Sequence, residues 1–221
     1  MDLAERIELF IAGVLQAVIV IVAIGAFWRE QWLVAFTGLL VFLLTFVPAI
    51  IERRLRVRLP VEFTLVTSVF LCASFALGEV SDFYERFWWW DLMLHGMSAV
   101  VTGLAGFLMV YVFYMTNRVR IAPVYVAIIS FGFAMTLGVI WEIFEFVVDW
   151  TMELDLQKSG LVDTMTDLMI NALGALIAAI TGYRYVKNGD SLIAFHLIQK
   201  FVDRNAALFP ETAGSKKIET K

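Results

Sequence analysis

Long apolar runs alternate with short polar segments along most of the chain. The charge-poor runs cover residues 7–27, 32–51, 61–77, 91–115, 122–150 and 163–185. Each approaches or exceeds the roughly 20 residues that a helix needs to cross the hydrocarbon core of a bilayer. The pattern predicts an all-α, polytopic membrane protein with about six transmembrane helices, in which residues 1–187 form a single transmembrane domain.

The polar segments between the runs predict an orientation. If the amino terminus is cytoplasmic, 14 of the 17 basic residues fall in cytoplasmic segments, and only Arg29, Arg86 and Lys158 fall outside. Cytoplasmic loops of membrane proteins carry this excess of Lys and Arg. With an even number of spans, we expect both termini in the cytoplasm and the protein in the plasma (inner) membrane.

The pattern changes after Lys187. Residues 188–209 place Phe195, Ile198, Phe201 and Val202 on one helical face, so they predict an amphipathic helix on the cytoplasmic membrane surface. Asp190 or Ser191 is the expected cap of this helix. Residues 210–221 are polar and are expected to be disordered.

Composition narrows the possible functions. The chain of 221 residues is 61% hydrophobic and 17% charged, which excludes a soluble domain. The lone cysteine, Cys72, excludes an intrachain disulfide and a cysteine-only metal site. Nucleic-acid binding has no support, because the predicted orientation already explains the arginines at 53–58. The acidic leader before residue 9 predicts a retained first span rather than a cleaved signal peptide.

Three predicted spans carry polar residues at helical spacing. The residues share one expected depth, in the outer half of the membrane: Asp91 and His95; Glu142, Glu145 and Asp149; Asp163, Asp167 and Asn171. At a rise of about 1.5 Å per residue, each stripe extends about 6 to 12 Å along its helix. The three stripes are therefore expected to converge.

These acids need compensation inside a membrane. A charged residue at the centre of a bilayer costs about 2.5–3.5 kcal/mol on insertion scales, and the outer halves of these spans contain no Lys or Arg. Carboxylates with one imidazole suit a divalent cation such as Mg²⁺, Mn²⁺, Zn²⁺ or Fe²⁺. The expected metal ligands are Asp91, His95, Glu142, Glu145, Asp163 and Asp167, with Asn171 and Asp149 as supporting groups.

Structural roles are the alternative for several of these residues. Asp163 and Asp167 fit helix caps, because Thr164 and Asp167 have the spacing of a capping box. Asp149 fits a position at the membrane interface, and His95 fits a residue hydrogen-bonded between helices. Glu142 and Glu145 have no comparable structural explanation, so the functional reading depends most on them.

The polar residues resemble a known family. The shared pattern is Asp91-x-x-x-His95, Trp141-Glu142-x-x-Glu145 and Asp163-Thr164-x-x-Asp167-x-x-x-Asn171-x-x-Gly174. Over residues 82–185 this pattern resembles the YjdF-type family of small bacterial inner-membrane proteins, and more remotely the VanZ-like proteins. The second resemblance implies a function in the cell envelope without naming a reaction.

Three classes of function remain open. The first is a membrane-embedded enzyme with His95 and Glu142 as catalytic residues, a metal-activated water, and a lipid or envelope substrate bordered by the aromatic cluster at 83–90. The second is a transporter or channel for a metal ion, a proton or a small cation. The third is a scaffold, and assembly into a homo-oligomer is compatible with each. We favour the enzyme, because the inner halves of the last three spans contain no acid or base before Arg184, which is counted with the cytoplasmic residues.

Overall fold

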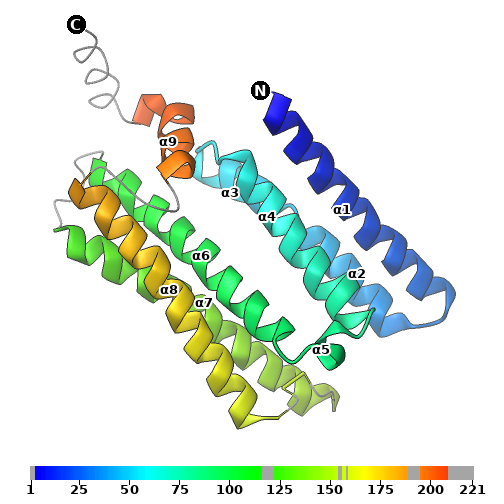
Figure 1. The fold of residues 1–221 in the computed structure, drawn as a ribbon. Helices are drawn as coiled ribbons and strands as arrows, with labels where there is room; N and C mark the ends of the chain where they lie inside the picture. The colour runs from blue at the N-terminus through cyan, green and yellow to red at the C-terminus, as the bar shows by residue number, and fades with distance from the viewer. Residues whose placement is uncertain (1–2, 116–121, 154–155, 158, 189–194, 209–221) are drawn as a thin grey trace, which may run out of the picture. The chain divides into compact units, whose positions relative to one another are not determined.

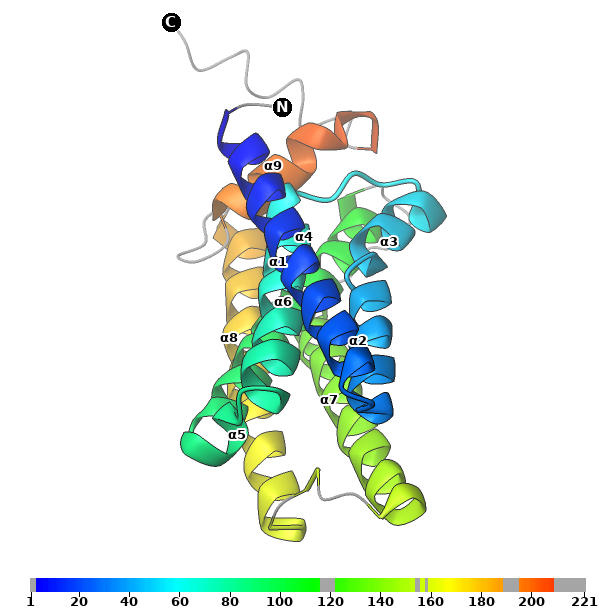
Figure 2. The same ribbon diagram turned by 90° about the vertical axis from the view of Figure 1, so that its right-hand side faces the viewer.

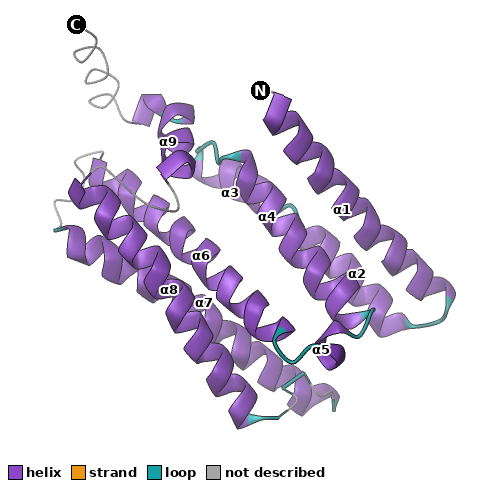
Figure 3. Cartoon of the chain, in the orientation of Figure 1, coloured by secondary structure: helices purple, strands orange, loops and turns teal. Residues whose placement is uncertain are grey.

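A computed structural model describes residues 3–115, 122–153, 156–157, 159–188 and 195–208. Every regular element in these residues is a helix (Figure 3). Six helical segments are long and apolar enough to cross a membrane: Leu3–Trp28, Trp32–Leu55, Val61–Glu79, Trp90–Phe113, Pro123–Met152 and Leu161–Asn188. The prediction of an all-α protein with about six transmembrane helices is confirmed. The placement of both termini in the cytoplasm stays a prediction.

Two of the spans are each built from two pieces. The second span consists of α2 (Trp32–Leu44) and α3 (Val47–Leu55). Between them the Thr45 hydroxyl donates to the Phe42 carbonyl at 2.6 Å, and Pro48 lies in the first turn of α3, where proline is well tolerated. The third span consists of α4 (Val61–Cys72), which continues as the π-helix η1 (Ala73–Glu79).

The chain divides into two compact units, Met1–Trp90 with Gln199–Ala206, and Asp91–Ile198 with Ala207–Lys221. In the first unit, α1 (Leu3–Trp28) packs against α2 and α4 (Figure 1). Its apolar core centres on Ile19, Cys72, Phe75 and Ala76. The short helix α5 (Phe83–Arg86) is followed by an aromatic segment that ends at Trp90, and the Phe83 ring packs edge-on against Trp90.

The amphipathic helix predicted near the carboxyl terminus is present as α9 (Phe195–Arg204), followed by η2 (Ala206–Leu208). Phe201 and Val202 of its apolar face are buried against the rest of the chain. The position of this helix on the cytoplasmic membrane surface stays a prediction. In the first unit, Lys200 pairs with Glu62 and Arg204 pairs with Glu5. The expected cap at Asp190 or Ser191 and the tail at 210–221 lie outside the described residues.

The second unit is built on α6 (Trp90–Met115), α7 (Pro123–Met152) and α8 (Leu161–Asn188). α7 packs along α8, and the two are connected at the lower end of Figure 2. Small residues allow α6 to approach α8 closely: a Cβ at Gly174 would lie 2.5 Å from the Gly96 carbonyl oxygen. Close packing of this kind favours association of helices in membranes.

The half of this unit away from the acidic residues is tightly packed. A Cβ at Gly103 of α6 would lie 2.5 Å from the Ala178 Cβ of α8, and Phe107 is fully buried. The buried Ser130 hydroxyl of α7 donates to the Gly103 carbonyl at 2.6 Å. The three helices therefore meet in a close seam there, and they hold their carboxylates and His95 at the other end.

Candidate functional site

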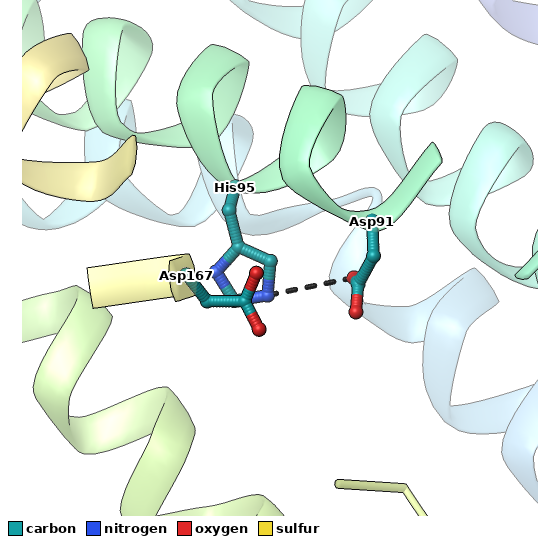
Figure 4. A group of neighbouring side chains, drawn as sticks. All are labelled: Asp91, His95 and Asp167. Carbon is teal, nitrogen blue, oxygen red and sulfur yellow. Dashed lines mark ion pairs between the residues drawn. The ribbon is translucent and has the colours of Figure 1, made fainter. Parts of the chain in front are cut away.

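α6 supplies the imidazole of the site. Asp91 lies in the first turn of this helix, and His95 follows one turn later, so both project from the same face. The His95 Nε2 atom lies 3.5 Å from Asp91 Oδ1 (Figure 4). His95 is buried, whereas the Asp91 side chain is 26% exposed. The histidine is thus held inside the unit with Asp91 on its more open side.

α7 supplies two carboxylates, Glu142 and Glu145, which lie one turn apart. Glu142 is only 4% exposed, and neither of its carboxylate oxygens accepts a hydrogen bond from the described part of the chain. The His95 Nδ1 atom lies 3.7 Å from Glu142 Oε1. The Thr164 and Gln157 side chains interact with the carboxylate, although neither donates a hydrogen bond of normal geometry to it. A buried carboxylate in this condition carries a large desolvation cost.

α8 supplies Asp167 and Asn171, which are both almost fully buried. The Asn171 Nδ2 atom lies 3.4 Å from His95 Nδ1. Gly138 of α7 leaves room for this amide, because a Cβ at that position would lie 2.5 Å from Asn171 Nδ2. The glycine that begins the acidic stretch of α7 is therefore part of the site, although it contributes no functional group.

The side chains form two groups that share the histidine. Asp91, His95 and Asp167 each offer one potential metal-ligand atom within 4.8 Å of the other two, and the same holds for His95, Glu142 and Glu145. Figure 4 shows the first group, with the Asp167 carboxylate beside the imidazole. Ligand atoms at this separation can all contact one cation after small side-chain movements, because Mg²⁺ and Zn²⁺ bind oxygen at about 2.0–2.2 Å.

Two expected site residues lie outside these two groups. Asp163 is half-buried, in the first turn of α8, and belongs to neither group of potential ligands. The Asp149 carboxylate accepts hydrogen bonds from the backbone N–H groups of Leu156 and Gln157, both at 2.8 Å. In this structure Asp149 therefore holds the loop after α7.

Gln157 contacts the site, and the sequence did not indicate this residue. Its Nε2 atom donates to the Thr164 hydroxyl at 2.8 Å and approaches the Glu142 carbonyl oxygen at 3.4 Å. Gln157 thus connects the loop to both α7 and α8 beside the carboxylates. A single polar residue in a loop has no periodicity, so no pattern pointed to it.

The charges of the two groups are unbalanced. Asp91, Glu142, Glu145 and Asp167 surround one imidazole, and the halves of α6, α7 and α8 that carry these residues contain no Lys or Arg. Such a set of ligands can bind a divalent cation, or it can share protons among its carboxylates. Its oxygen-rich composition fits the divalent ions that prefer oxygen with one nitrogen ligand.

Comparisons with known proteins place the chain in a family. Residues 7–188 match the family described as predicted membrane protein (DUF2238), the YjdF-type family. An uncharacterized protein of Thermotoga maritima is 29% identical over 143 residues, which is 63% of this chain and 71% of that protein. No solved structure matches. The likeness to VanZ-like proteins stays a prediction. The chain belongs to the DUF2238 family of predicted membrane proteins.

Proposed function

We propose that the cluster around His95 binds a divalent cation inside the membrane. This proposal rests on the environment of Glu142. Its carboxylate is buried and accepts no hydrogen bond of normal geometry from the described residues, and its Oε1 atom lies 3.7 Å from His95 Nδ1. A bound cation would compensate this charge and that of Glu145. A buried ion without such compensation costs several kcal/mol.

We further propose that the protein is an inner-membrane enzyme that acts on a lipid or another cell-envelope substrate. The cation would polarise a phosphoryl or acyl oxygen of the substrate or activate a water molecule, which are the usual roles of a catalytic divalent ion. His95 and Glu142 would position the cation. Asp91 is 26% exposed, whereas Glu142 and Asp167 are buried, so Asp91 is better placed than these two to exchange a proton with water or substrate.

Transport of a metal ion, a proton or a small cation is the second candidate. A transport path needs polar groups on both sides of the membrane midplane or a rearrangement that exposes the site to each side. Within the described residues, the seam around Gly103, Ala178 and Phe107 brings no carboxylate and no imidazole together. This close packing favours a site reached from one side, and hence the enzyme.

The metal proposal predicts a stoichiometric divalent ion in the purified protein. Elemental analysis should find it in the wild type and find it lost in Glu142→Gln, because the amide removes an anionic ligand. Glu153→Gln is the matched control, since Glu153 is exposed just after the same helix and belongs to neither group. A wild type that stays metal-free after dialysis against Mg²⁺, Mn²⁺, Zn²⁺ or Fe²⁺ would refute the proposal.

Two assays separate the enzyme from the transporter. Protein reconstituted into liposomes of bacterial envelope lipids is incubated with the cation it binds, and the lipids are analysed by mass spectrometry. If the protein is an enzyme, we expect a new lipid product that is absent with Glu142→Gln. If the protein is a transporter, we expect a flux of Mn²⁺ or protons, reported by a dye inside the same liposomes, and no lipid product.

A further inference from the structure

The two nitrogens of His95 face different partners. Nε2 faces Asp91 at 3.5 Å, while Nδ1 faces Glu142 at 3.7 Å and Asn171 at 3.4 Å. The lone pairs of an imidazole diverge, so one ion cannot bind both nitrogens. In the neutral ring one nitrogen is a donor and the other an acceptor. A single cation must therefore use one side of the ring and leave an N–H on the other.

The Glu142 side has the greater need of a cation. Glu142 is 4% exposed and both its oxygens lack a hydrogen-bond donor among the described residues. The Asp91 side chain is 26% exposed and lies in the first turn of α6, where the backbone N–H groups stabilise negative charge. Asp91 is thus compensated by water and by its helix, whereas Glu142 is not.

The Glu142 side also offers the more complete set of ligands. Glu145 brings a second carboxylate within 4.8 Å of the others, and Asn171 approaches Nδ1 from α8. A half turn of the amide presents its oxygen in place of its nitrogen, and an amide oxygen is a ligand for divalent cations. Gly138 keeps the space that the amide occupies. Three helices then contribute ligands to one position.

We propose that the cation binds His95 Nδ1, Glu142, Glu145 and the Asn171 amide oxygen, and that Asp91 is a positioning residue that accepts the Nε2–H of His95. This inference rests on the proposed metal binding and assigns it to one side of the imidazole. A metal-bound histidine commonly donates its other N–H to a carboxylate, which fixes its tautomer. Asp167 then lies beside Asp91 as a carboxylate outside the metal ligands.

The tautomer of Zn²⁺-loaded protein tests this assignment directly. The full chain labelled with ¹⁵N-histidine contains two histidines, and His196→Gln identifies the signals of His95. Long-range ¹⁵N–¹H correlations should place the proton on Nε2 and the metal on Nδ1. A proton on Nδ1 in protein that does bind Zn²⁺ would overturn the assignment while leaving the metal site intact. Failure to bind Zn²⁺ or any other divalent ion would remove both proposals.

Three variants provide an independent readout. Glu145→Gln removes a ligand and should weaken Zn²⁺ binding by more than 100-fold. Asp91→Asn should weaken it by about 10- to 100-fold, the usual effect of losing a partner behind a ligating histidine, and should shift the ¹⁵N signal of His95 Nε2. Asp91→Glu should restore part of the affinity. The assignment fails if Asp91→Asn abolishes binding and Glu145→Gln leaves it unchanged.

Discussion

Glu142→Gln is expected to abolish stabilisation by Mn²⁺ without destabilising the metal-free protein. The wild-type carboxylate is buried without a hydrogen-bond donor among the described residues, so a neutral amide of the same shape removes a cost. A ligand at a free concentration 100 times its dissociation constant stabilises the folded protein by about 2.7 kcal/mol. Thermal unfolding in detergent, with and without Mn²⁺, should show this gain in the wild type and not in the variant.

Glu153→Gln is the control for this experiment, because it makes the same chemical change at an exposed position just after α7. It should respond to Mn²⁺ as the wild type does. The account would be wrong if Glu142→Gln lowered the unfolding temperature of the metal-free protein while keeping the full response to Mn²⁺. That pattern would show Glu142 to be a structural residue with no part in binding a cation.

Gly174→Ala is expected to destabilise the second unit and to weaken the site together. The added Cβ would lie 2.5 Å from the Gly96 carbonyl oxygen and 2.9 Å from the Ala99 Cβ, so α6 and α8 must separate. Overpacking of this kind costs about 1–3 kcal/mol. Because His95 is on α6 and Asn171 on α8, the separation should also weaken Mn²⁺ binding. Thermal unfolding and Mn²⁺ titration measure the two effects.

Gly132→Ala is the matched control, since a Cβ at Gly132 of α7 would meet nothing within 4 Å. Alanine is favoured over glycine inside a helix by about 1 kcal/mol, so this variant should be as stable as the wild type or more so. Equal effects of the two substitutions would contradict the close approach of α6 and α8. A destabilised Gly174→Ala protein with unchanged Mn²⁺ affinity would separate the packing from the site.

The hydrophobic pattern was sufficient to predict the spans, because a run of about 20 apolar residues has few alternatives to crossing a bilayer. It did not predict the division of the second span at Thr45, where one hydroxyl bonds to the Phe42 carbonyl. It predicted that the apolar face of α9 meets the membrane surface, and it did not predict that Phe201 and Val202 of that face are also buried against the rest of the chain. An apolar stripe predicts that a helix face is shielded from water, but not whether lipid or protein shields it.

The site was predictable to the level of helical faces. Spacing placed His95 one turn after Asp91, and Glu142 one turn before Glu145, and the structure brings these residues together. Spacing does not give side-chain direction across three helices, so it could not show that the two nitrogens of His95 face different carboxylates. Asp149 matched the acidic stripe, yet its carboxylate binds the backbone of the following loop.

The most direct test of the central claim is the position of a bound cation. Crystals of the full chain grown with Mn²⁺ should give an anomalous difference peak about 2.1–2.3 Å from a nitrogen of His95 and from an oxygen of Glu142, the usual range for such ligands. The same map from Glu142→Gln crystals should lack the peak. Ordered His95 and Glu142 side chains with Mn²⁺ peaks only elsewhere would contradict a metal site in this cluster.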